Sequence, residues 1–337
     1  TLSILEKRQR EIESFVPKPF WQIELHVSVD GESITAVHEK GKFWEKQEAL
    51  EALERCREKP GIVSSVEKKE YKQNPNPPFD LTSLQRESYN LFGYSPKRTL
   101  DIAQTLYEQA LISYPRSSSQ KLPPKIGYRN ILQRLSGQKE YSKLCEELLQ
   151  KKHLRPVEGK KTDPAHPAIF PTGNTPRKLN PSQKKIYDLI TKRFISVFAD
   201  PAVREQVKIS IAVGPEMFVA HGVRTVKNGW IDFYRPYARF KEQVLPELRK
   251  GERTEIEKIE LLEKETQPPK RYTQSSILKE MEALGLGTKG TRAAILQTLY
   301  DRGYIKEQSI VVTELGKAVV NALETVSYTH LTLPTKA

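Results

Sequence analysis

Hydrophobic and polar positions alternate along residues 21–37, a pattern that predicts a half-buried β-hairpin. Trp21, Ile23 and Leu25 begin a run in which every second side chain is apolar and those between are polar. Asp30-Gly31 lies within this run and is a dipeptide typical of hairpin turns. The neighbouring segments predict a charged helix within residues 1–20, a helix at 44–58, a further strand at 62–71 and a linker at 74–78.

Helical periodicity dominates residues 80–198. An apolar stripe that starts at Leu100 recurs with helical spacing. Ser95-Pro96 and Asn180-Pro181 are typical of helix starts, where a capping side chain precedes proline. A proline-rich loop at 162–176 separates the predicted helices.

Strand patterning returns over residues 203–262, beginning with the alternating Val207, Ile209 and Ile211. Two β-rich segments therefore flank a long helical block. A structureless loop of that length is implausible inside a compact domain. We therefore expect a β-rich domain into which a helical domain is inserted.

Residues 273–312 show a third pattern. Thr273 precedes a helical stretch that ends at Gly285, a glycine-rich turn follows, and a second helix is expected from about Gly290 to Arg302. Short apolar runs then predict a hairpin. This order of elements is typical of a winged-helix unit, although two helices joined by a glycine turn also occur in many other folds.

Charge changes the picture, because the formal net charge of +13 is concentrated in one part of the chain. Residues 97–193 contain 20 Lys and Arg but 8 Asp and Glu, with tyrosines between them. Such a surface suits a polyanion whose bases can stack, so a nucleic-acid partner is favoured over a solvated lysine-rich face. Cys56 and Cys145 are too few for a disulfide framework, and the apolar runs are too short for a membrane span. We therefore expect a cytoplasmic protein.

Several common catalytic patterns are excluded. Residues 285–291 resemble a phosphate-binding loop but lack its Lys and following Ser or Thr, so no ATP site is predicted. The eight aspartates include no pair two positions apart, and neither His-Glu-x-x-His nor Gly-x-Ser-x-Gly occurs. The sequence therefore predicts no metal site in this chain.

Tyr114-Pro115-Arg116 is the candidate for chemistry. Pro115 disfavours a helical conformation at Tyr114, and in an extended stretch Tyr114, Arg116 and Ser118 would share one face. A tyrosine hydroxyl is a weak nucleophile at neutral pH, but cations that stabilise phenolate and phosphoryl charge would activate it. With fourteen tyrosines in the chain, this pattern by itself leaves Tyr114 open to an ordinary structural role.

Four blocks in this order resemble those of a type IA DNA topoisomerase of the archaeal kind. They are residues 78–85 before the helical part, 111–119 around the tyrosine, 165–172 around His166, and 285–295 with 301–304 near the end. The resemblance covers about residues 1–326. It implies cleavage of one DNA strand through a 5′-phosphotyrosine intermediate, strand passage and religation, with relaxation of supercoils independent of ATP.

The resemblance implies an α+β multidomain fold: a β-rich arch, an inserted helical domain and a winged-helix-like base. The expected boundaries are the start of the base at 1–20, the arch at 21–78 and 203–262, the helical domain at 79–202, the DNA-binding base at 263–326, and a non-native tail at 327–337.

Family positions can be carried over residue by residue. The resemblance implies that Tyr114 is the catalytic nucleophile and that Arg116 assists it, and it assigns DNA contacts to Gln104, Glu108, Ser113, Ser117, His166, Thr291 and Arg292. Ser118 stands where bacterial relatives carry Asp, so no role is carried over for that carboxylate. Thr288-Lys289 replaces an Arg-Pro pair, so neither residue is assigned a role.

The family's Toprim domain, which would hold Mg²⁺, is expected to be missing from this core fragment, which would itself bind no metal. The expected partners are single-stranded segments of negatively supercoiled DNA and the Toprim domain of the parent chain, for a monomer associated with the nucleoid. Two alternatives stay open, a single-stranded DNA-binding fragment that is inactive without Toprim and a piece of reverse gyrase. A tyrosine recombinase or type IB enzyme is disfavoured because Tyr114 lies in the first half of the chain.

Overall fold

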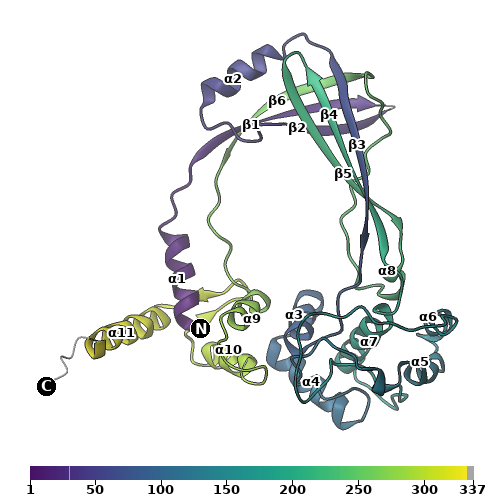
Figure 1. The fold of residues 1–337 in the computed structure, drawn as a ribbon. Coiled ribbons are helices and arrows are strands. Elements are labelled where there is room, and N and C mark those ends of the chain that lie inside the picture. The colour runs from purple at the N-terminus through teal and green to yellow at the C-terminus, as the bar shows by residue number, and fades with distance from the viewer. Residues whose placement is uncertain (30, 332–337) are drawn as a thin grey trace.

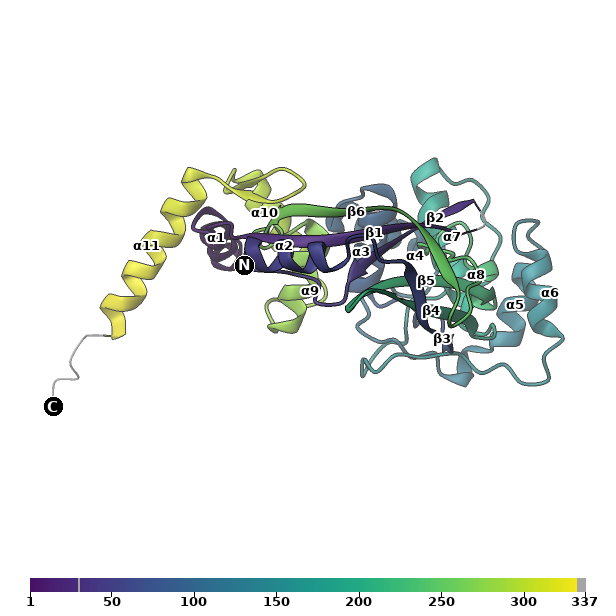
Figure 2. The same cartoon turned by 90° about the horizontal axis from the view of Figure 1, so that it is seen from above.

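The chain folds into an arch whose two feet meet (Figure 1). The computed structural model describes residues 1–29 and 31–331. A β-barrel lies at the top, the helical body forms one foot and the base forms the other. We use "helical body" for residues 79–201 with 228–240, and "base" for residues 1–13 with 267–331. Seen from above, the last helix projects away from the other elements (Figure 2).

The barrel closes in the strand order β1-β2-β5-β4-β3-β6. Its strands are antiparallel to their neighbours, and the predicted hairpin at 21–37 is confirmed by the pairing of Val29 with Glu32, although Asp30 lies outside the described residues. Ile23, Leu25 and Val27 point into the barrel core with no exposed surface, as their alternation predicts. The strands are β1 (Pro19–Val29), β2 (Glu32–His38), β3 (Gly61–Gln73), β4 (Ala202–Val213), β5 (Glu216–Lys227) and β6 (Arg253–Glu265), and helix α2 (Lys46–Arg55) packs beside them.

Pairs of strands continue below the barrel as two legs (Figure 1). In one leg β1 and β6 stay paired as far as Pro19 and Glu265, which leads both ends of the pair into the base. In the other leg β3 and β4 stay paired as far as Gln73 and Ala202. The two ends of the inserted segment therefore leave the sheet side by side, which explains how a long helical insertion is tolerated.

The helical body has a core of its own, and its helix starts follow the capping signals in the sequence. Ser95 accepts a hydrogen bond from the backbone of Arg98, and Asn180 forms a capping box with Gln183. Asp80 forms a third capping box with Ser83. The elements are α3 (Leu81–Phe92), α4 (Pro96–Glu108), η1 (Pro124–Ile126), α5 (Tyr128–Ser136), α6 (Ser142–Leu149), α7 (Pro181–Ser196) and α8 (Trp230–Phe233).

Helix α8 corrects one predicted boundary, because residues 203–262 were assigned to the arch throughout. Trp230, Phe233 and Tyr234 instead pack into the core of the helical body. Strand β5 ends at Lys227, which pairs with Val203 at the start of β4. The chain therefore re-enters the helical body where β5 ends. Gly229 allows the approach, since a Cβ there would lie 2.5 Å from the carbonyl oxygen of Asp200. Residues 228–252 carry no barrel strand, in contrast to the continuous strand patterning that we expected.

The base forms around a third apolar cluster that includes Leu5, Ile277 and Leu296. Thr273 caps its first predicted helix in a capping box with Ser276. The elements are α1 (Leu2–Glu13), α9 (Gln274–Ala283), α10 (Arg292–Asp301), β7 (Ile305–Lys306), β8 (Val311–Val312) and α11 (Glu314–Leu331). The expected tail at 327–337 overlaps the end of α11, and residues 332–337 lie outside the described residues. No helix in the described part of the chain is long and apolar enough to cross a bilayer.

A buried arginine ties the helical body to the leg above it. Arg193 of α7 donates to Glu87 of α3, to the hydroxyl of Tyr234 at 2.8 Å and to the carbonyl of Pro77 at 3.1 Å. Its guanidinium also stacks 4.2 Å from the centre of the Phe79 ring. The arginine therefore joins two helices, the segment after α8 and the end of the linker.

We predict that Arg193→Met destabilises the fold, because it leaves the Glu87 carboxylate and the Tyr234 hydroxyl without their shared donor. The free energy of unfolding should fall by about 3 kcal/mol, measured by urea denaturation followed by circular dichroism. The control is Arg57→Met, whose side chain is 70% exposed and pairs with an equally exposed Glu54. The control should change stability by less than about 0.5 kcal/mol, and equal losses in both variants would refute the proposed role of Arg193.

Candidate active site

The tyrosine segment begins where α4 ends. Ala110 has a positive φ of 56°, which turns the chain out of the helix. Ile112 then forms a β-bridge with Pro171, and the backbone N–H of Ser113 donates to the carbonyl of Phe170 at 2.8 Å. The extended conformation predicted from Pro115 is thus confirmed, with the tyrosine segment lying alongside the loop that carries His166.

Burial alternates along this segment as an extended chain requires. Pro115, Ser117 and Ser119 are buried, whereas Tyr114, Arg116 and Ser118 are partly exposed. The predicted common face of the latter residues therefore exists. It faces away from the core of the helical body.

Two aromatic rings lie against Tyr114. Its ring centre is 4.7 Å from that of His166 and 5.4 Å from that of Tyr107, which α4 supplies. Tyr107 is 40% exposed, so the cluster is open to solvent on one side. A hydroxyl, an imidazole and an accessible aromatic face are thereby gathered at one place.

Asp163 lies in the loop that carries His166, and its side chain is 1% exposed. It accepts hydrogen bonds from the backbone N–H of Ser118 at 3.0 Å and from the Ser118 hydroxyl at 2.9 Å. Lys289 from the base also donates to it. Burial would raise the pKa of the Asp163 carboxyl, but the hydrogen bonds from Lys289, Ser118 and Ala165 together hold that pKa well below its usual value. Asp163 is therefore a carboxylate at neutral pH.

The glycine-rich turn of the base meets the tyrosine segment here. A Cβ built on Gly290 would lie 3.8 Å from Cδ of Arg116, which places this turn against the catalytic candidate. Gly287 has a φ of +64°, a conformation that side chains rarely adopt. Thr291 accepts a hydrogen bond from the backbone of Thr288 at 2.8 Å and is exposed.

A second polar contact joins the base to the helical body. Lys161 binds Glu282 of α9 at 2.5 Å and Asp80 at the start of α3 at 3.1 Å. Thr82 donates to Glu282 at 3.2 Å. Burial would lower the pKa of Lys161, but hydrogen bonds to Glu282 and Asp80 raise it above its usual value. The two feet of the arch are thus joined through charged groups.

The remaining predicted site residues divide into two groups. Gln104 and Glu108 lie on α4 and bind each other at 3.1 Å, on the helix that carries Tyr107. Ser113 uses its hydroxyl within the protein, donating to Ala168 and accepting from the backbone of Phe170. These positions stay candidates for contact with a ligand, although Ser113 would have to exchange an internal bond for it.

Two residues that were predicted to contact DNA have side chains that are engaged within the protein. Ser117 has no exposed surface, and its hydroxyl bonds to the carbonyl of His166 and the backbone of Ser119. The side chain of Arg292 is 12% exposed and folds back onto the carbonyls of Leu286 and Gly287. Both side chains form hydrogen bonds to the backbone of nearby loops. The spacing of residues in the sequence does not reveal these bonds.

Sequence reasoning missed Asp163 and Lys289. Asp163 stands three residues before His166, in a spacing typical of a turn in which a carboxylate accepts from the following backbone. That signal was available in the sequence. Lys289 had no comparable signal, because its partner is 126 residues away along the chain.

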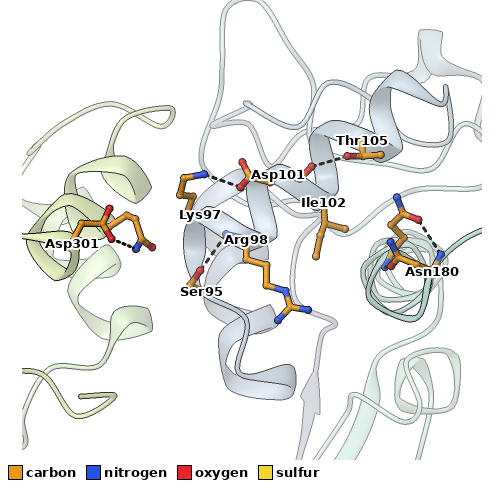
Figure 3. A pocket seen from close by; sticks show the side chains of 10 residues that line it. Ser95, Lys97, Arg98, Asp101, Ile102, Thr105, Asn180 and Asp301 are labelled. Atoms are coloured by element: carbon orange, nitrogen blue, oxygen red, sulfur yellow. Dashed lines mark hydrogen bonds and ion pairs between the residues drawn. The ribbon is translucent and has the colours of Figure 1, made fainter. Parts of the chain in front are cut away.

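A groove of about 490 Å³ runs between the two feet (Figure 3). The first turns of α4 supply Lys97 and Arg98, α7 supplies Asn180 at its start, and α10 supplies Asp301 from the other side. Lys97 is paired with Asp101 at 2.9 Å, and Arg98 donates to Ser182 at 2.9 Å. The groove follows the helix that leads to Tyr107 and the tyrosine segment.

Within the described residues, no three His, Cys, Asp or Glu side chains gather closely enough to hold a metal ion. The side chains described here therefore do not fit the Mg²⁺ site that the family resemblance implies.

Comparison with known proteins identifies relatives along nearly the whole chain. The DNA topoisomerase 1 of Pyrococcus horikoshii is 50% identical over 327 residues, which cover 96% of this chain and 48% of the relative. That of Methanocaldococcus jannaschii is 47% identical over 326 residues, covering 96% of this chain and 42% of the relative. The chain thus spans less than half the length of these two relatives.

A solved structure and a family match agree with these relatives. Full-length topoisomerase I from Thermotoga maritima superposes with a TM-score of 0.77 at 28% identity, over 96% of this chain and 54% of that one. Residues 1–335 match the family described as DNA topoisomerase, Topoisom_bac. The chain belongs to this DNA topoisomerase family.

Proposed function

We propose that this chain is the tyrosine-bearing part of a type IA DNA topoisomerase, which cleaves one DNA strand and reseals it. The observation that carries the proposal is the position of Tyr114, partly exposed, against His166 and on the same face as Arg116. Membership of the DNA topoisomerase family supports it.

The proposed chemistry is a transfer of a phosphoryl group to tyrosine. The Oη atom of Tyr114 attacks a backbone phosphorus, a Tyr–O–P bond forms, and the P–O3′ bond breaks. The tyrosine proton leaves and the departing 3′ oxygen takes up a proton, so a 3′-hydroxyl and a 5′-phosphotyrosine result. Arg116 and His166 would stabilise the charge on the phosphate oxygens. Because the new ester keeps the bond energy, the reverse attack by the 3′-hydroxyl reseals the strand without ATP.

The arrangement of the chain suits passage of a second strand. The barrel would act as the arch, and parting of the base from the helical body would open a gate beside the tyrosine. The base, with its α9-turn-α10-hairpin order, is proposed as a winged-helix-like unit in which Thr291 contacts DNA. The groove at Lys97 and Arg98 is proposed to guide a single strand toward Tyr114.

Other parts of the assignment are proposals as well. The Mg²⁺ of the family would be held by groups other than the side chains described here, so no step above passes through it. The protein is proposed to act as a monomer in the cytoplasm, on single-stranded segments of supercoiled DNA. A second candidate is binding of single-stranded DNA without cleavage, for which the groove with Lys97 and Arg98 would suffice.

We predict that Tyr114→Phe abolishes covalent capture of DNA, because phenylalanine lacks the attacking oxygen. The assay uses a chimera in which this chain replaces the matching segment of the Pyrococcus horikoshii relative, with Mg²⁺ and a labelled single-stranded oligonucleotide. After denaturation, label at the 3′ end should remain on the protein and label at the 5′ end should not.

The control in this assay is Tyr71→Phe, a tyrosine of strand β3 in one leg of the arch, outside the site. It should form the adduct as the unmodified chimera does. An adduct that persists in Tyr114→Phe would overturn the assignment of the nucleophile. A chimera that binds the oligonucleotide but never forms an adduct would favour binding without cleavage.

We also predict that the groove at α4 carries part of the electrostatic binding. For the unmodified chain, a plot of log Kd for an oligothymidine against log salt concentration should be steep. The double variant Lys97→Gln with Arg98→Gln should lower the slope of this plot by up to about 1.4, because each phosphate contact to a single strand contributes about 0.7. Fluorescence anisotropy measures this binding.

A second basic groove provides the matched control. It is lined by Arg129, Lys152 and Arg155 beside α5, with a volume of about 590 Å³. Lys152→Gln with Arg155→Gln removes the same charge and should leave the salt slope unchanged. If both double variants lower the slope equally, the groove at α4 has no special role.

A further inference from the structure

The two oxygens of the buried Asp163 carboxylate serve two different segments. Oδ1 accepts hydrogen bonds from the backbone N–H groups of Ala165 at 3.0 Å and His166 at 3.3 Å. These bonds shape the turn that presents His166. The imidazole Nδ1 of His166 lies 3.9 Å from the same oxygen, too far for a hydrogen bond, so Asp163 acts on His166 through the backbone of the loop.

The other oxygen, Oδ2, holds the tyrosine segment. It accepts from both the backbone N–H and the hydroxyl of Ser118, four residues after Tyr114. The Ser117 hydroxyl adds a bond of 3.4 Å to the carbonyl of His166. One carboxylate therefore fixes the distance between the segment that carries Tyr114 and the loop that carries His166.

The base supplies the compensating charge. Lys289 donates to Oδ2 of Asp163 from the glycine-rich turn, and its side chain is 34% exposed whereas that of Asp163 is 1% exposed. A buried carboxylate needs hydrogen bonds or a counter-charge to stay ionised. The ammonium group leaves with the base if the two feet of the arch part, and the carboxylate then loses its only cationic hydrogen-bond donor among the described residues.

We propose that Asp163 is a positioning residue that sets Tyr114 against His166, and that Lys289 makes this setting depend on the docked base. This proposal rests on the proposed function. The Tyr114–His166 ring contact of 4.7 Å is then the closed, cleavage-ready arrangement. Chemistry at the tyrosine is thereby coupled to closure of the arch, because the group that neutralises Asp163 belongs to the moving foot.

The test distinguishes the hydrogen bonds accepted by Oδ1 of Asp163 from those accepted by Oδ2. Asp163→Asn can keep an acceptor at Oδ1 for the histidine turn but replaces Oδ2 by an amide nitrogen, which cannot accept from Ser118 or Lys289. Ser118→Ala and Lys289→Gln remove single partners and are milder. Each variant is placed in the chimera, and two quantities are measured, the single-turnover rate of adduct formation and the Kd for the same oligonucleotide.

We expect Asp163→Asn to slow adduct formation by at least tenfold while Kd changes by less than threefold, because a misplaced nucleophile loses rate without losing affinity. Lys289→Gln should also slow the reaction, and the double variant should be no slower than Asp163→Asn, since both act through one ion pair. Circular dichroism reports whether the fold is kept, and if Asp163→Asn fails to fold, Ser118→Ala and Lys289→Gln decide the question.

The control is Asp232→Asn, an exposed aspartate of α8 paired with Arg235, which should match the unmodified chimera. A folded Asp163→Asn variant with an unchanged rate would overturn the positioning role, and rate losses that multiply in the double variant would overturn the coupling to Lys289. Failure of the proposed function would look different, since the unmodified chimera would then form no adduct that depends on Tyr114.

Discussion

Polar contacts between the base and the helical body close the arch, whose three parts have separate hydrophobic cores. The candidate site lies where these contacts form. The barrel, the helical body and the base each bury their own apolar cluster. Where the base meets the helical body, the contact depends on Lys161 with Glu282 and on Lys289 with Asp163. Partly exposed ion pairs contribute far less to stability than an apolar core does, so the parts can stay intact while the contact opens.

Because the base and the helical body meet through polar contacts, the candidate site is divided between these two parts. Tyr114 and His166 belong to the helical body, whose capped helices and buried Arg193 hold it together independently of the base. The turn with Gly290 and Lys289 belongs to the base, which reaches the tyrosine only through closure of the arch. The proposed nucleophile therefore lies in one part of the fold, and residues from another part complete its surroundings.

One departure from the family pattern takes on a different meaning in the structure. Ser118 occupies a position where the resemblance led us to expect an aspartate in bacterial relatives. A carboxylate does lie at this place, but Asp163 supplies it from the histidine loop and Ser118 binds it. Ser118 and the carboxylate that it binds are 45 residues apart along the chain.

The sequence by itself determined the elements whose signals are local. The alternation of apolar and polar residues predicted the β1–β2 hairpin, and the capping residues Ser95, Asn180 and Thr273 predicted helix starts. These signals can be recognised because a helix cap or a strand face depends on a few neighbouring residues. Tyr114 could be singled out from its block and from the proline that extends it. The tertiary structure alone decided that α8 returns to the helical body, that Ser117 and Arg292 are turned inward, and that Lys289 meets Asp163. These outcomes depend on contacts between residues far apart in the chain, and no local pattern records which distant partner will bury or neutralise a side chain.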